Sequence, residues 1–248
     1  GGKHLSLRDE FTAMVRGATP DVVLTAVELL AEQAGDVVVV DAGGATTDVH
    51  SVVELDPEDA ALARQVVAPM PVSRTVEGDL GMRWSAVDTV AAGRESGLVA
   101  LPEYDGLARA ALRRRDDPSY LPDSDAERAH DERLAAVAVG VALRRHAGRQ
   151  QVRFGPEGRL VERTGKDLRE VDVLVGSGGV LRHHGPEFAV RVLGGSCGHG
   201  IEGGWLLPGT PRVTVDRDYV LAAAGLLAGP HPQAARGLLH RLVEGAPR

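Results

Sequence analysis

The sequence predicts an α/β domain with a mixed central sheet and a smaller inserted subdomain, and three observations lead to this fold class. Two runs, Val37–Val40 and Val171–Val175, are mostly apolar, as expected of strands covered on both faces of a sheet. Each run leads into a glycine-rich turn. Segments with helical spacing of apolar residues lie between such runs, and this alternation favours a layered α/β architecture.

The composition limits the class of protein. The chain has 248 residues, 43% hydrophobic and 25% charged, which suffices for a buried core and excludes a disordered tail. Its one cysteine, Cys197, excludes an internal disulfide framework. The net charge of −7 argues against a nucleic-acid partner, and we interpret the basic run Arg113–Arg115 as a solvated helix face. We see neither a membrane-length apolar run nor a secretory signal, so we expect no membrane partner and a cytoplasmic location.

The N-terminal part contains one clear helix signal. Residues 1–18 carry no element that we can define, so we assign them to an N-terminal extension, and the Gly1-Gly2 pair is typical of a cloning remnant. From Thr19, which can cap a helix, apolar residues recur at helical spacing. Gly35 supplies the stop, so the pattern predicts a helix between these two residues.

Strand signals follow this helix. The apolar run at 37–40 and a second run at 49–53 flank a short glycine-rich segment, which predicts a hairpin with a glycine-rich tip. Residues 57–71 have the character of a loop or a short helix, and residues 74–78 are a plausible third strand.

The middle of the chain differs in composition from its flanks. We interpret residues 101–165 as an inserted smaller subdomain, with residues 19–100 and 166–248 forming the core. Within the insert, a long helix is predicted at 131–146 and a hairpin turn at 154–158.

The C-terminal part is predicted to return to the sheet and end in helices. The predicted strand at 171–175 is the return to the sheet. Near the end of the chain, Asp216 can cap a helix that stops at Gly229. A final amphipathic helix extends to about Val243.

The turn Asp41–Asp48 combines three features that suit the phosphates of a nucleotide. Glycine amides can cradle phosphate oxygens, threonine hydroxyls can donate to the same oxygens, and an aspartate can hold hydrated Mg²⁺. An ordinary hairpin turn is the alternative, because glycine and aspartate are also common turn residues. The residues concerned are Gly43, Gly44, Thr46 and Thr47 for phosphate, and Asp41 and Asp48 for the metal.

The second glycine turn, Gly176-Ser177-Gly178-Gly179, also follows a strand. Such a turn can pass beneath a nucleobase and sugar, or it can let a helix pack closely on the sheet. A P-loop is excluded because the chain lacks its motif, and a dinucleotide fingerprint does not follow the first strand. Cys197 with His199, and the polar cluster Glu77, Asp79 and Arg83, are weaker candidates for chemistry.

Separated segments resemble one superfamily and one family within it. The turn after the first strand resembles the second phosphate motif of the actin, sugar-kinase and heat-shock ATPase superfamily, and Gly176–Gly179 resembles its adenosine motif. Three segments are similar to the GlmL family, also called glutamate mutase MutL. They are Asp41–Ser51, Arg74–Arg83 and Asp218–Leu227. The resemblance extends from about Thr19 to Leu227.

The resemblance implies an RNase H-like fold of the actin type and an ATP-binding domain of a reactivating chaperone or accessory protein. The implied partner is a subunit of an adenosylcobalamin-dependent mutase such as glutamate mutase, and the implied cofactors are ATP and Mg²⁺. In this family pattern Asp41 orients Mg²⁺ or the attacking water, the first turn holds phosphates, and the second turn, with Gly176, Ser177, Gly178 and Gly179, borders adenosine.

One departure from the family pattern affects the expected activity. Family members carry an earlier Asp-x-Gly-Ser-Thr-type phosphate motif, and nothing before residue 19 matches it, so the chain corresponds to the second half of such an ATPase. Phosphoryl transfer needs charge neutralisation from both sides of the nucleotide, so we expect weak binding and negligible hydrolysis by this part alone, with ATPase activity reserved for a full-length protein. A small-molecule kinase of the same fold and a non-catalytic interaction module remain alternatives.

Overall fold

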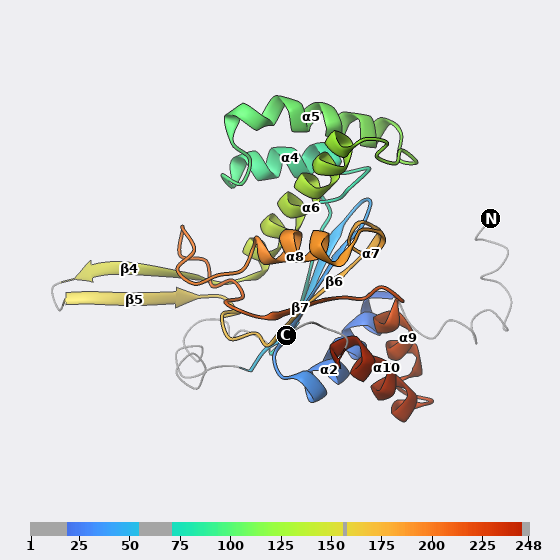
Figure 1. The fold of residues 1–248 in the computed structure, drawn as a ribbon. Helices are drawn as coiled ribbons and strands as arrows, with labels where there is room; N and C mark the ends of the chain where they lie inside the picture. Colours follow the sequence, from blue (N-terminus) through green and yellow to red (C-terminus); the bar gives the residue numbers. More distant parts are fainter. Residues whose placement is uncertain (1–18, 55–70, 156–157, 245–248) are drawn as a thin grey trace, which may run out of the picture.

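The computed structural model describes residues 19–54, 71–155 and 158–244. These residues form a layered α/β body with helices on both faces of a central sheet, and a two-stranded ribbon that extends away from the body (Figure 1). The mixed sheet confirms the predicted α/β class and is consistent with an actin-type fold. In the described ranges, none of the helices combines the length and the apolar character needed to cross a bilayer.

The central sheet contains five strands in the described part of the chain. The first three strands form an antiparallel meander, and the last two lie parallel to the first. Because the carboxyl ends of parallel strands meet at one edge of a sheet, the turns that follow them are neighbours in space. In spatial order the strands are β3 (Val72–Glu77), β2 (Thr47–Val52), β1 (Val37–Ala42), β6 (Val173–Ser177) and β7 (Arg212–Val215).

Alternate residues of β1 build two cores, because side chains of a strand alternate between its faces. Val38 and Val40 pack with α6 and α8 on one face, and Val37 and Val39 pack on the other. The first face carries α4 (Ala86–Glu95), α5 (Leu101–Asp116), α6 (Asp125–His146), α7 (Gly179–His183) and α8 (Pro186–Gly194), and the second carries α2 (Thr19–Ala34), α9 (Val220–Leu227) and α10 (Pro232–Glu244) (Figure 1).

Most of the elements predicted from the sequence are present. The hairpin of β1 and β2, the third strand and the helix that stops at Gly35 are confirmed; this glycine has a φ of +84°. Asp216 caps α9, since its carboxylate accepts the amide N–H groups of Val220 and Leu221 at 2.7 and 3.0 Å. The long helix α6 begins six residues before the predicted start, because Ser124 caps it through the amide of Glu127.

Other elements were not predicted, namely α4, α5, α8 and β7. The segment 57–71, expected as loop or short helix, lies outside the described residues except for Pro71.

The predicted insert contains α5, α6 and the ribbon of β4 (Arg149–Gly155) and β5 (Gly158–Thr164). α6 also packs on the sheet, where the ring of His146 bonds to the hydroxyls of Ser51 and Thr75 at 2.8 and 3.0 Å. Burial, together with Lys166 and His50, lowers the pKa of His146 to about 3, so this buried imidazole stays neutral at physiological pH. The boundaries of the insert stay a prediction.

Candidate functional site

The two glycine turns singled out in the sequence lie side by side at one edge of the sheet. Asp41 pairs with Ser177 across β1 and β6. Gly178 has a φ of +97°, and a β-carbon at this position would lie 2.2 Å from the carbonyl oxygen of Ala42 and 2.9 Å from Oδ1 of Asp41. Only glycine therefore allows the second turn to approach the carboxylate at the end of β1 so closely.

The tip of the β1–β2 hairpin is held by the segment that follows β3. Gly81 lies against the tip, since a β-carbon there would be 2.6 Å from the carbonyl oxygen of Gly44. Three hydrogen bonds then fix the shape of the tip and occupy its carbonyl oxygens. They join Met82 N to Gly43 O at 2.9 Å, Arg83 N to Gly44 O at 2.8 Å, and Ser85 Oγ to Ala45 O at 2.6 Å.

Unlike the carbonyl oxygens of the tip, most of its backbone amides have no hydrogen-bond partner among the described residues. Gly43 N–H donates to the carbonyl of Thr46 at 2.9 Å. Among the residues that the structure describes, the amides of Gly44, Ala45 and Thr46 have no hydrogen-bond acceptor. Ala45 is exposed, and its two neighbours are half-buried. Successive unpaired amides at an accessible turn can bind an anion.

The two threonines at the tip have different surroundings. Thr46 is half-buried, and its hydroxyl lies 3.5 Å from Oδ2 of Asp48. Thr47 is fully buried, and its hydroxyl donates to the carbonyl of Leu80 at 3.1 Å. Thr46 is therefore available beside the free amides, whereas Thr47 supports the tip from inside.

Asp41 has an unusual electrostatic environment. Burial, followed by the charges of Asp48 and Asp216, raises its pKa to about 6. Within the described ranges its carboxylate has no hydrogen-bond or ion-pair partner. A partly buried carboxyl with a raised pKa at the end of a strand is typical of a functional site.

Asp48 and Asp216 are both partly compensated by neighbours. Oδ1 of Asp48 lies 3.5 Å from the guanidinium of Arg74, and Asp216 is bound by the first amides of α9. No group of three or more histidine, cysteine or acidic side chains in the described part of the chain is placed to hold a metal ion. Asp41 and Asp48 therefore offer two carboxylates at the tip. Mg²⁺ that is bound by one or two carboxylates usually completes its coordination with water and phosphate oxygens.

The residues of the second turn divide into buried and open positions. Gly176 is buried, and a β-carbon there would lie 2.8 Å from a methyl of Leu193, so this glycine serves the packing of α8 on β6. Ser177 is also buried. Gly179 has open space around it at the start of α7.

Two residues near the second turn were not indicated by the sequence as site candidates. The guanidinium carbon of Arg182 lies 4.1 Å from the centre of the Tyr219 ring, and Tyr219 is half exposed with a φ of +53°. Positive φ is rare for a bulky side chain and marks local strain. The only available signals were the position of Arg182 three residues after Gly179 and that of Tyr219 three residues after the capping aspartate.

A third missed residue lies at the first turn. The six-membered ring of Trp84 covers Gly44, since a β-carbon on this glycine would lie 2.7 Å from the indole. Trp84 is 62% exposed, which is high for a tryptophan and places the indole where a ligand at the tip would meet it.

The residues that the sequence offered as weaker candidates for chemistry are engaged in ion pairs or are unreactive. Glu77 and Asp79 both bind the guanidinium of Arg145 at 2.7 Å. Burial raises the pKa of Cys197 to about 11, so its thiol is protonated at neutral pH and is a poor nucleophile.

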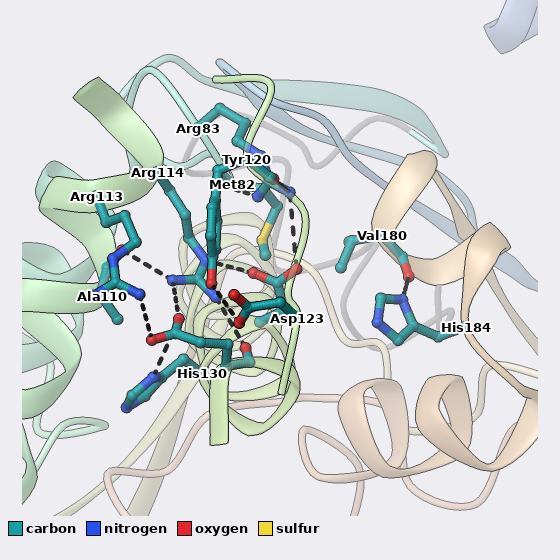
Figure 2. A network of polar contacts seen from close by, with 12 residues as sticks. Met82, Arg83, Ala110, Arg113, Arg114, Tyr120, Asp123, His130, Val180 and His184 are labelled. Atoms are coloured by element: carbon teal, nitrogen blue, oxygen red, sulfur yellow. Dashed lines mark hydrogen bonds and ion pairs between the residues drawn. The ribbon is translucent and has the colours of Figure 1, made fainter. Parts of the chain in front are cut away.

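A polar network connects the segment after the tip to the helices, and Figure 2 shows the part of it around Arg83, Arg114 and Tyr120. Arg83, which binds Gly44, also reaches the carbonyl of Tyr120 at 3.3 Å and a carboxylate oxygen of Asp131 at 3.7 Å. Asp131 in turn accepts Nε–H of Arg114 at 2.5 Å, and both of these side chains are almost fully buried. The prediction of a solvated face at 113–115 is therefore wrong for Arg114.

Asp41→Asn is expected to stabilise the fold at pH 7. Because the folded-state pKa of about 6 exceeds the ordinary 3.8, the charged form is disfavoured on folding. The resulting cost is complete above about pH 6 and absent below about pH 4, and we expect asparagine to relieve roughly 2 kcal/mol of it at pH 7. Urea unfolding of both proteins at pH 7 and pH 4 measures the difference, and equal stabilities at pH 7 would contradict the assignment.

Comparison with known proteins identifies relatives of the chain. A family model described as MutL protein matches residues 1–243. Protein MutL of Clostridium tetanomorphum is 34% identical over 252 residues, and the match covers 97% of this chain and 54% of the relative. The chain therefore spans about half the length of this curated relative.

Proposed function

Because the chain belongs to the MutL protein family, we propose that it forms one wall of an ATP site in an accessory protein of an adenosylcobalamin-dependent mutase such as glutamate mutase. The observation that carries the nucleotide part is the meeting of the two glycine turns around Asp41. The mutase part rests on membership of the family. Since the chain spans half of its relative, the activity and the partner are proposed for the full-length protein.

The residues at the turns fit the parts of Mg²⁺-ATP. The free amides of Gly44 and Ala45, with the amide and hydroxyl of Thr46, would bind phosphate oxygens. Asp41 and Asp48 would hold hydrated Mg²⁺, which neutralises phosphate charge when bound. Thr47 is left out of this set because its hydroxyl is bound inside the fold.

The second turn and its neighbours fit the nucleoside. The open backbone at Gly179 offers an approach for the sugar, and the half-exposed ring of Tyr219, with the guanidinium of Arg182 against it, offers flat surfaces for the base. In the alternative assignment, Asp41 would orient the attacking water in place of Mg²⁺.

A chaperone of this kind works only if the bound nucleotide changes its affinity for the partner. Closure of two halves around ATP can do so only if the partner binds the open and closed states with different affinity. Hydrolysis would then reset the equilibrium between the two states.

The test uses the full-length protein, Mg²⁺-ATP and the mutase from the same organism. Trp84 covers the tip, so its fluorescence is expected to change saturably with Mg²⁺-ATP, and the change should disappear in Trp84→Phe, which retains Trp205. The affinity for the mutase is then measured with and without Mg²⁺-ATP. Absence of a saturable signal would exclude the nucleotide site, and an unchanged affinity for the mutase would exclude the chaperone role.

A further inference from the structure

The segment that follows β7, residues 216–219, contains the one residue other than glycine that has a positive φ in the described part of the chain. This residue is Tyr219, whose φ of +53° and ψ of +38° lie in the left-handed region. It stands directly before α9, where extended backbone and a short polar side chain are usual. A bulky residue in this conformation costs free energy and persists only where its surroundings enforce it.

Asp216 joins this segment to the second glycine turn and to α9. Its N–H donates to the carbonyl of Gly176 at 2.9 Å. Its buried carboxylate accepts the amides of Val220 and Leu221 at 2.7 and 3.0 Å. Because these amides directly follow Tyr219, the carboxylate closes the chain into a short loop that contains this residue. Asp216 therefore enforces the left-handed conformation from both sides.

Arg217 joins the same segment to the end of α7. Its guanidinium donates to the carbonyls of Arg182 and His184, both at 3.2 Å. The guanidinium carbon of Arg182 in turn lies 4.1 Å from the centre of the Tyr219 ring. The segment thus contacts α7 twice, once through backbone carbonyls and once through the ring. Both contacts fix the ring relative to the second turn, which α7 follows.

We propose that Asp216 and Arg217 are positioning residues, which hold the ring of Tyr219 as a rigid platform for the base of the nucleotide. The side chain of Tyr219 is 45% exposed, so a ligand can reach part of it. Aromatic rings bind bases by stacking, which requires no particular hydrogen-bond pattern on the base. A ring that is already immobilised loses little conformational freedom on binding, and this gain offsets the backbone strain. The inference rests on the function proposed above and concerns the nucleoside side of that site.

The platform is tested by comparing Mg²⁺-ATP with Mg²⁺-tripolyphosphate, which has the phosphates but no base. Titration calorimetry of the full-length protein gives both affinities. The wild type is expected to prefer ATP. Tyr219→Ala should reduce this preference about tenfold, which is typical of a lost stacking contact, and should leave the affinity for tripolyphosphate unchanged. Tyr219→Phe keeps the ring and should bind both ligands as the wild type does.

The strain is tested by two substitutions at the same position. Tyr219→Gly and Tyr219→Ala both remove the ring, but only glycine adopts a positive φ without strain. Urea unfolding should therefore give a higher midpoint for Tyr219→Gly, although glycine is ordinarily the less stabilising of the two residues. Both variants should show the same loss of preference for ATP. Equal midpoints would show that the backbone is not strained at this position and would overturn the inference.

The positioning role is tested by changes outside the ring. Asp216→Ala and Asp216→Asn remove the same charge, but asparagine retains one acceptor oxygen for the amides of α9. Arg217→Ala removes an exposed side chain, and Arg241→Ala, which removes an exposed arginine of α10, is its matched control.

The two alanine variants at 216 and 217 are expected to lower the preference for ATP about fivefold each, because the ring must then be immobilised when the base binds. Asp216→Asn should lie between Asp216→Ala and the wild type, and Arg241→Ala should keep the wild-type preference. If Asp216→Ala does not fold, the comparison of Arg217→Ala with its control decides the question.

The outcomes separate this inference from the proposed function. If the wild type binds ATP and tripolyphosphate equally well, the platform does not hold the base and the inference is overturned, while the phosphate side of the proposed site stands. If the wild type binds neither ligand, both are overturned. If Tyr219→Ala loses the preference and the changes at 216 and 217 keep it, the assignment of Asp216 and Arg217 as positioning residues is overturned.

Discussion

Alanine in place of Gly178 is expected to destabilise the fold by roughly 3 kcal/mol and to abolish binding of Mg²⁺-ATP by the full-length protein. Two effects combine at this position. A φ of +97° is unfavourable for any residue with a β-carbon, and that carbon would lie 2.2 Å from the carbonyl oxygen of Ala42. The turn must therefore move away from β1, and the movement separates the nucleoside side of the proposed site from Asp41.

Gly179→Ala is the matched control, because the neighbouring glycine has open space around it. It lies at the start of α7, where alanine favours the helix, so its stability should equal or slightly exceed that of the wild type. Urea unfolding measures both variants, and fluorescence of Trp84 measures nucleotide binding. Equal stability of the two variants would show that the turns do not meet as closely as described.

The sequence predicted the turns but not the reason for each glycine. Strand ends and glycine clusters are local patterns, so the hairpin and the second turn could be placed from the order of residues alone. The difference between Gly176, which serves packing, and Gly178, which faces Asp41, depends on contacts between distant segments. A single sequence carries no local pattern for such contacts.

The elements that were not predicted are those whose burial is set by distant partners. β7 has four residues with half-buried character on most positions, and it is defined by pairing with β6. α4 and α5 pack mainly on each other and on α6, so no helical stripe faces a recognisable strand. Trp84 and Tyr219 were missed for the same reason, since each becomes a site candidate only through its neighbour across the fold.

Arg114 shows most clearly how tertiary structure changes the meaning of a residue. It is the middle member of a run of three arginines, yet it is fully buried, whereas the side chain of Arg113 is 56% exposed. Its guanidinium donates to Asp131, to a carboxylate oxygen of Glu127 and to the carbonyls of Ala110 and Glu127. This set of acceptors compensates for the removal of the charge from water.

Arg114→Ala is expected to destabilise the fold by about 3–5 kcal/mol, because Asp131 would remain buried without its main partner. Arg113→Ala removes a similar side chain and one ion pair to Glu127, but its exposure predicts a far smaller loss. Because both substitutions remove the same kind of side chain, the difference between their losses in the free energy of unfolding measures the effect of burial. Unfolding in guanidinium chloride gives both values, and losses of equal size would contradict the described network.

The double variant Arg114→Met with Asp131→Leu tests whether the network supports stability or the position of the tip. Apolar replacements of both partners remove the unpaired charge and should recover most of the stability lost in Arg114→Ala. They also remove the carboxylate that lies 3.7 Å from Arg83, whose amide holds Gly44. We therefore expect a stable double variant with altered Trp84 fluorescence and weaker nucleotide binding. Wild-type binding by that variant would show that the tip is positioned by its backbone bonds alone.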